Sequence, residues 1–155
     1  NAGNCCQCYA AIAIGYCAGY YCQGECAIAI GTDAGNCNQC CGAIAIGSRA
    51  GYCSQCSCAV AIGNNAGQNT QGQECIAIGT QSGENNQAQN SVALGYQAGQ
   101  NSQGVGATAG TSTIAIGYQS GYQNTFASTE LFMVAGLEQN NSYSLARFFG
   151  IIKSP

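Results

Sequence analysis

The residues best suited to chemistry are cysteines: the chain has 13, and 12 of them lie between residues 5 and 58. Several follow the spacing Cys-x-Gln-Cys, which brings two thiols close together along the chain. Thiols spaced in this way can form disulfides or, as thiolates, bind zinc or iron. The disulfide candidates are Cys5, Cys6, Cys8, Cys17, Cys22, Cys26, Cys37, Cys40, Cys41, Cys53, Cys56, Cys58 and Cys75.

Residues 37–56 contain two of these pairs, in the layout of a four-thiolate zinc or iron–sulfur site. However, an internal repeat of 16 residues generates the same layout. In a stacked repeat, equivalent Cα atoms lie about 4.8 Å apart, within the range of a disulfide. We therefore predict disulfides or cross-links, with a metal or redox cluster, or reduced packing cysteines, as the alternatives. The alternative metal ligands are Cys37, Cys40, Cys53 and Cys56.

The rest of the composition argues against catalysis. The chain has no His, and its six carboxylates are scattered singly along the sequence. Without imidazole there is no Ser/His/Asp or Cys/His arrangement and no His ligand for a metal. We predict that the protein is not an enzyme and carries no cofactor.

Charge and hydropathy also exclude two classes of partner. Only three residues are basic, too few to neutralise a run of phosphates, so a nucleic-acid partner is not expected. The longest apolar runs, such as residues 43–46, are far shorter than the roughly 18 residues of a membrane-spanning helix. Because 46% of residues are apolar, the chain should nevertheless fold.

A strict internal repeat organises the sequence. The tetrad Ile-Ala-Ile-Gly, or a close variant, ends every 16 residues from Gly15 to Gly95, and a last copy ends at Gly117. A second glycine follows four residues after each tetrad. A third marker is a column of glutamines at Gln7, Gln23, Gln39, Gln55, Gln71, Gln87 and Gln103.

This repeat predicts an all-β, parallel β-solenoid. A helical repeat would be longer and would avoid two glycines per unit. We expect each repeat to form one coil, with the tetrad as one strand, the glycines in tight turns and the glutamine segment as a second strand. About seven coils would occupy residues 1–125, with a six-residue insertion within 104–113. Stacked glutamines should hydrogen-bond along the axis as a structural ladder.

The tetrad alternates Ile and Ala, so both faces of the strand are apolar. We expect Ile12 and Ile14 to face the inside of the coil and Ala11 and Ala13 to face outward. A column of exposed alanines would form an apolar stripe that another copy of the chain could cover. The alternative is that these alanines are tolerated surface residues.

The tetrads, the following Ala-Gly and the Ser-Val-Ala-Leu-Gly of residues 91–95 resemble the head repeats of trimeric autotransporter adhesins. Similar copies are found in surface and tail fibres of large viruses and phages. The resemblance covers about residues 2–125 and implies a left-handed parallel β-roll, a homotrimer, and an adhesive or structural role. This sequence departs from that family in its 16-residue period, where about fourteen is common, and in its cysteines.

Tyrosines recur at two turn positions of the repeat. Exposed tyrosine among Asn and Gln can stack on sugars and hydrogen-bond to hydroxyls, which suits glycan contact. The alternative is that these rings cover the edge of the coil. The candidates are Tyr16, Tyr20, Tyr52, Tyr96, Tyr118 and Tyr122.

After residue 125 the period stops. Residues 131–134 and 145–152 are expected to be two strands of a hairpin within 126–155, forming either a cap on the stack or the start of a further β domain. Phe132, Phe148 and Phe149 could cover the open end. Since the chain begins in mid-repeat without Met, we expect it to be part of a longer array.

Together these features favour a structural component of a surface fibre, spike or stalk, located outside the cell or on a virion. Its expected partner is itself, as a homotrimer. A first alternative is a binding module that recognises glycans or a protein on a host surface. A second is a metal- or electron-carrying filament that uses the aligned cysteines.

Overall fold

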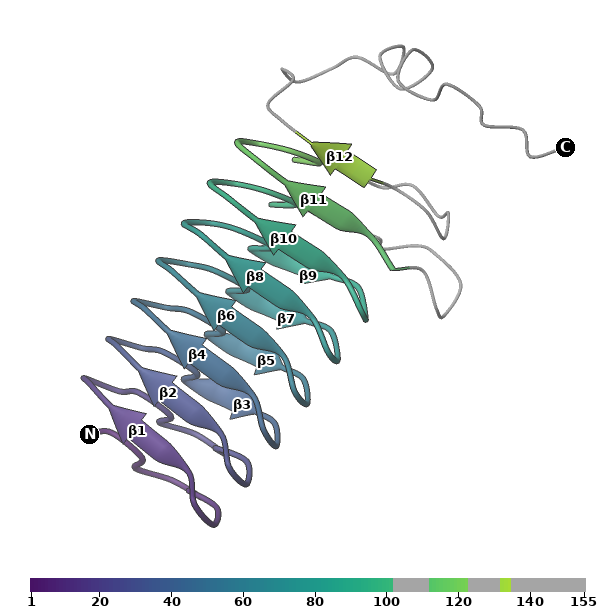
Figure 1. The fold of residues 1–155 in the computed structure, drawn as a ribbon. Helices are drawn as coiled ribbons and strands as arrows, with labels where there is room; N and C mark the ends of the chain where they lie inside the picture. The colour runs from purple at the N-terminus through teal and green to yellow at the C-terminus, as the bar shows by residue number, and fades with distance from the viewer. Residues whose placement is uncertain (102–111, 123–131, 135–155) are drawn as a thin grey trace, which may run out of the picture.

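The computed structural model describes residues 1–101 and 112–122 and the backbone of 132–134. Its strands form two parallel sheets, drawn in Figure 1 as a regular stack of coils. The eight-stranded sheet runs β1-β2-β4-β6-β8-β10-β11-β12, and the four-stranded sheet runs β3-β5-β7-β9. The all-β, parallel solenoid is thus confirmed, with about five turns. The part of the chain that the structure describes contains no helix that could cross a membrane.

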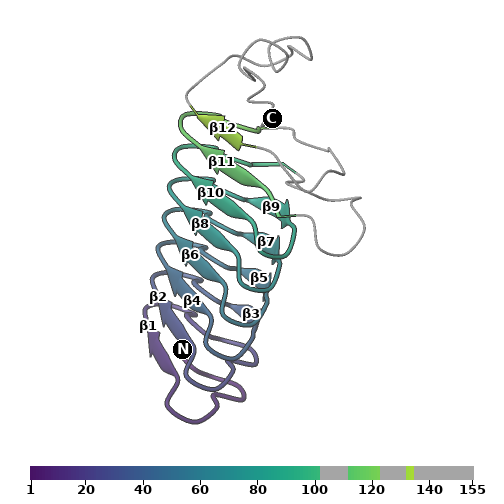
Figure 2. The same ribbon diagram turned by 45° about the vertical axis from the view of Figure 1, so that its right-hand side comes forward.

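Every strand is three residues long. The larger sheet contains β1 (Ile12–Ile14), β2 (Ile28–Ile30), β4 (Ile44–Ile46), β6 (Val60–Ile62), β8 (Ile76–Ile78), β10 (Val92–Leu94), β11 (Ile114–Ile116) and β12 (Phe132–Val134). The smaller sheet contains β3 (Cys37–Gln39), β5 (Cys53–Gln55), β7 (Asn69–Gln71) and β9 (Asn85–Gln87). Figure 2 shows the smaller sheet behind the larger one, with turns joining the two.

Pairing is in register, so each residue lies beside its equivalent in the next coil. Ala29 pairs with Ala45, and Gln55 pairs with Gln71. We call such a set of equivalent residues a column. Backbone hydrogen bonds continue through the turns: the amide of Gly31 donates to the carbonyl of Ile14 at 2.8 Å. Gly31 cannot be replaced there, because an added Cβ would lie 2.6 Å from the carbonyl oxygen of Gly47.

The prediction for the faces of the tetrad strand is wrong. Alanines form the core: Ala29 and Ala45 are fully buried, whereas Ile12 and Ile14 are 45% and 58% exposed. The reason is the thinness of the coil. A Cβ added to Gly51, in the turn between β4 and β5, would lie 3.3 Å from the Cβ of Ala45, so the interior beside Ala45 has no room for isoleucine.

Alternation along the strand therefore carries the larger side chains outward. The isoleucines of the inner coils are half-buried by their neighbours in the column, and Ile78 and Ile114 are each 39% exposed. Residues that precede the strands also point inward, since Ala27, Ala43 and Ala59 are fully buried. The larger sheet thus presents a stripe of aliphatic side chains to the exterior.

The glutamine column crosses the interior. Gln55 is fully buried, and its Nε2 donates to the carbonyls of Ile44 at 2.7 Å and Ala59 at 3.1 Å and to Oε1 of Gln71 at 3.2 Å. Gln39 donates to Gln55 at 3.2 Å in the same way. These amides tie the two sheets together, and those of Gln39, Gln55 and Gln71 also donate to the glutamine of the next coil. Gln23 donates only to carbonyls of the backbone, so the Oε1 of Gln39 is left without a hydrogen-bond partner. Gln7 is exposed at the first coil, and Gln103 lies outside the described residues.

Most of the expected insertion and C-terminal region lies outside the described residues, including the second predicted strand, Phe148 and Phe149. The first predicted strand is present as β12, which pairs in parallel with β11, Phe132 opposite Ile114. That segment therefore extends the larger sheet by one strand. The division into residues 1–125 and 126–155 stays a prediction.

Replacing Gln55 by Met should lower the free energy of unfolding by about 2–4 kcal/mol. Methionine has a similar size but loses the bonds that the two Nε2 hydrogens donate to three acceptors and the one accepted by Oε1, each bond being worth about 0.5–1.5 kcal/mol net. Urea unfolding followed by circular dichroism measures the change. The exposed Thr32→Ala variant is the control and should change stability by less than about 0.5 kcal/mol. Equal stability of the two variants would show that the ladder contributes nothing.

Candidate functional site: the cysteine columns

Register brings six cysteines together as three neighbouring pairs. Cys37 in β3 is the Cα partner of Cys53 in β5. The 16-residue period also places Cys40 beside Cys56, each directly after a glutamine of the glutamine column. It places Cys6 beside Cys22, each directly before such a glutamine. We call these the three in-register pairs. They lie on the smaller sheet and its flanking turns, in the N-terminal half of the stack.

The pair Cys37–Cys53 is half-buried. Burial raises the pKa of Cys37, and the neighbouring Cys53 thiol and the carboxylate of Asp33 raise it further. Its Sγ donates a hydrogen bond to Oδ1 of Asn36 at 3.1 Å. A second negative sulfur beside the first is therefore unfavourable unless a cation compensates it.

The other two pairs show the same coupling. The pKa of Cys22 is raised first by Cys6, with smaller contributions from burial and from Cys5 and Cys8. Burial raises the pKa of Cys40, and Cys56 raises it further. In each pair the sulfur atoms are thus close enough for the charge of one to act on the other.

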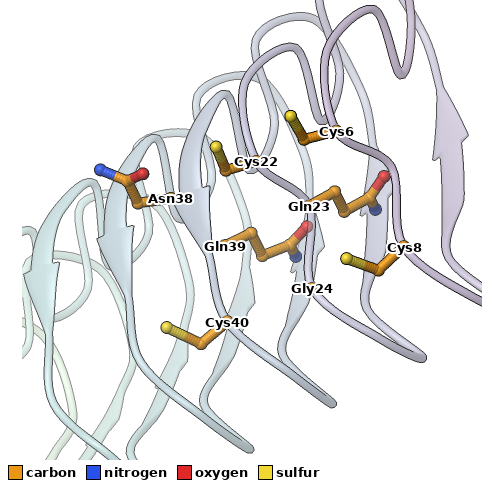
Figure 3. Close-up of a pocket in the computed structure, with 8 residues that line it drawn as sticks. All are labelled: Cys6, Cys8, Cys22, Gln23, Gly24, Asn38, Gln39 and Cys40. Carbon is orange, nitrogen blue, oxygen red and sulfur yellow. The ribbon is translucent and has the colours of Figure 1, made fainter.

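An open recess of about 350 Å³ lies beside the pair Cys6–Cys22. Figure 3 shows the side chains of Cys6 and Cys22 projecting in the same direction, with Asn38 as the next residue of that column. Cys8 and Cys40 form a second row, and Gln23 and Gln39 lie between the two rows. Gly24 lines the recess and occupies the position between Cys8 and Cys40. Cys8 and Cys40 are therefore two coils apart. An added Cβ at Gly24 would lie 2.6 Å from the backbone of Cys40, so glycine lets the coils pack closely at this point.

The four thiols named as the alternative metal ligands are not gathered as one group. In the part of the chain that the structure describes, no group of three or more His, Cys, Asp or Glu residues is arranged to hold a metal ion. Cys37 and Cys40 are separated by Asn38 and Gln39 and belong to different columns, so the two pairs are not brought together on one ion. All 13 cysteines are free thiols in the structure, and the expected disulfides stay a prediction.

Cys75 differs from the other cysteines. It lies in the inward-facing column of Ala43 and Ala59, is fully buried, and its Sγ donates to the carbonyl of Ala88 at 2.6 Å. Burial raises its pKa to about 11. Its column neighbours are Ala59 and Ser91, so it is a packing residue and not part of a thiol pair.

Five cysteines have positive φ, a conformation that costs roughly 1 kcal/mol or more for residues other than glycine and asparagine. Other coils place Asn, Asp, Arg, Ser or Glu at the same positions, for example Asn38 in the column of Cys22. The backbone thus does not require cysteine at these sites. The five are Cys6, Cys17, Cys22, Cys26 and Cys58.

The tyrosines do not form one continuous surface. Tyr96 and Tyr118 stack in adjacent coils with ring centroids 5.5 Å apart, but Thr32, Ser48, Asn64 and Thr80 separate them from Tyr16. Tyr16 is exposed, and Cys17 beside it raises its pKa. The tyrosines of the other turn position are half-buried: Tyr20, Tyr52 and Tyr122.

Two further side-chain ladders escaped the analysis of the sequence. Asn69 donates to Asn85 at 2.9 Å, and Asn85 donates to Asn101 at 3.0 Å. These asparagines continue the column of Cys37 and Cys53 through later coils. Alignment of the repeats position by position would have revealed this column. The second ladder links Gln81, Gln97 and Gln119.

Comparisons with protein-family models, with curated proteins and with solved structures gave no significant match. The geometry of the described residues is therefore the basis for any functional conclusion.

Stability should fall above about pH 9 because of Cys75. The folded chain holds this proton up to a pKa of about 11, whereas an ordinary cysteine ionises near 9.0. The stabilisation is complete below pH 9 and is lost as pH rises towards 11, by an amount on the order of 2 kcal/mol. Urea unfolding between pH 8 and 11 measures it.

The Cys75→Ala variant is the matched control, because alanine occupies this position in neighbouring coils. It should lose less stability than the parent chain over the same pH range. Identical pH profiles would show that the buried thiol does not titrate as stated.

Proposed function

We propose that the chain is a rigid structural segment of a surface fibre, spike or stalk, outside the cell or on a virion. The observation that carries this proposal is the unbroken register of small residues and buried glutamines through successive coils. Such a stack has a fixed rise of about 4.8 Å per coil. The proposal includes seven coils and the left-handed winding implied by the resemblance to adhesin heads.

The segment is proposed to assemble as a homotrimer through the aliphatic stripe, and not through the alanines. The stripe consists of the outward columns that contain Ile28 and Ile30, and it crosses every coil of the larger sheet. A second copy of the chain is the occupant that fits best, because its side chains recur at the same spacing. Because both copies repeat with the same rise per coil, the side chains of one stripe can interdigitate with those of the other along its length. The described part of the stripe contains no charged residue that would oppose this contact.

Disulfides are proposed between chains, at exposed thiols outside the in-register pairs. Cys26 and Cys58 are separated in their column by Gly42, and Cys41 lies between Glu25 and Ser57. These thiols have no equivalent thiol in the adjacent coil of the same chain. Bonds between chains would resist mechanical load and proteolysis in an oxidising environment.

Replacing Ile46 by Glu should convert the trimer into monomers. The side chain lies on the stripe, so three carboxylates would be buried close together in the assembly. Light scattering under reducing conditions should give three times the chain mass of 15.7 kDa for the parent and a single chain mass for the variant. Ile46→Leu is the control, because Leu94 occupies the same column, and it should remain trimeric. A monomeric parent would refute the trimer.

The stacked rings of Tyr96 and Tyr118 favour a second candidate function, contact with neutral glycans. Binding of the parent chain to a glycan array should be lost in Tyr96→Ala and retained in Tyr9→Ala, which removes another exposed ring. No binding by the parent chain would leave the structural role alone.

A further inference from the structure

The geometry of the three in-register pairs points to a function beyond the structural role. We propose that each pair binds one soft, two-coordinate monovalent cation, of the class of Cu(I) and Ag(I), between its two sulfur atoms. The pairs are Cys6–Cys22, Cys37–Cys53 and Cys40–Cys56.

The distance between coils sets the distance between the sulfur atoms. Because the coils are related by translation, equivalent atoms of Cys37 and Cys53 are separated by about 4.8 Å when both side chains adopt the same rotamer. If each metal–sulfur bond is close to the zinc–thiolate length of about 2.3 Å, a linear arrangement spans about 4.6 Å between the two sulfurs. The stack thus presents two sulfurs at nearly the separation that such a cation requires.

A disulfide fits the same pair less well. It needs an S–S distance of about 2.05 Å and Cβ atoms about 3.5–4.5 Å apart. Stacked Cβ atoms lie close to the full coil spacing of about 4.8 Å. Closing the bond would therefore pull two coils together, against backbone hydrogen bonds such as that from Cys40 N to Gln55 O at 2.9 Å.

Later coils show how side chains align in the column of Cys37 and Cys53, where asparagine replaces cysteine. Asn69, Asn85 and Asn101 occupy the same column and bond directly to one another at 2.9 and 3.0 Å. Their side chains therefore point the same way in successive coils. Figure 3 shows the corresponding alignment for Cys6 and Cys22, whose side chains project together from adjacent coils.

Ligand type selects the cation. Thiolates are soft ligands that prefer Cu(I), zinc and iron–sulfur clusters among biological metals. Zinc needs about four ligands, and no group of three or more metal-ligating residues is arranged to hold an ion in the described part of the chain. A pair of thiolates therefore suits a cation that accepts two ligands.

Binding requires no change of oxidation state. The two S–H bonds break, two protons pass to the solvent, and two metal–sulfur bonds form. The bound cation also neutralises part of the repulsion between the sulfurs, which in the metal-free chain raises the pKa of Cys22 and contributes to that of Cys37 and Cys40.

The test is an anaerobic titration of the reduced full chain with Cu(I), in the presence of a competing chelator strong enough to hold copper away from single thiols. Ultraviolet charge-transfer absorption and the metal content after gel filtration give the stoichiometry. We expect three equivalents per chain, and no equivalents of zinc retained under the same conditions.

The decisive comparison is between single and double variants of one pair. Cys37→Asn, Cys53→Asn and the double variant should each lose one equivalent, because one thiol of a pair cannot hold the cation alone. Asparagine is the natural residue in later coils of this column, so the fold should be kept, which circular dichroism checks. Cys41→Ser, outside the pairs, should lose none.

A new site can also be built in the C-terminal half. Asn85→Cys combined with Asn101→Cys should add one equivalent, whereas Asn85→Cys alone should add none. Binding that decreases or increases in proportion to the number of thiols, retention of zinc in place of copper, or no retention of copper by the parent chain would each overturn the proposal. So would intact Cys37–Cys53 disulfides that survive in chain purified under mild reduction.

Discussion

The constraint on which the rest of the structure depends is translation by one coil. Sixteen residues return the backbone to the same place about 4.8 Å further along the axis, so every residue lies against its own equivalent. Side chains must therefore tolerate contact with copies of themselves. Alanine, isoleucine, asparagine and glutamine satisfy this condition, whereas stacked like charges would repel one another. The chain accordingly has only nine charged residues, three basic and six acidic.

The interior follows from the same translation together with the shortness of the strands. Two sheets with three-residue strands enclose a narrow space, in which a Cβ added to the turn residue Gly51 would lie 3.3 Å from the Cβ of Ala45. Alanine fills this space but contributes little apolar area, so burial by itself is a modest source of stability. The buried glutamine of each coil compensates by bonding to both walls and to its own copies, as Gln55 does. A polar residue thus carries much of the cohesion of the core.

The period could be obtained from the sequence, and with it the solenoid, the strand positions and the glutamine ladder. Which face of the tetrad strand points into the core could not be predicted. Alternation of Ile and Ala gives two apolar faces, and periodicity does not show which of them is inside. What decides it is the width of the coil, in which Gly51 and its equivalents in the turns pack directly against the strand alanines. Isoleucine inside is the ordinary expectation for a sheet, and it fails here because the turn residues lie too close to the strand.

The pairs Cys37–Cys53 and Cys40–Cys56 follow from the repeat, which also left a four-thiolate site as an alternative. The register of the strands shows that each side chain contacts its equivalents in the adjacent coils, and that Cys37 and Cys40 belong to different columns. The same column holds asparagines in later coils, where each amide supplies both the donor and the acceptor that its neighbours need. Two thiols are weak hydrogen-bonding partners for each other, so a cysteine column leaves binding capacity unused. The proposed cation would bind both sulfurs of such a pair. The backbone would not need to rearrange, because it already holds asparagine side chains in the same alignment in later coils.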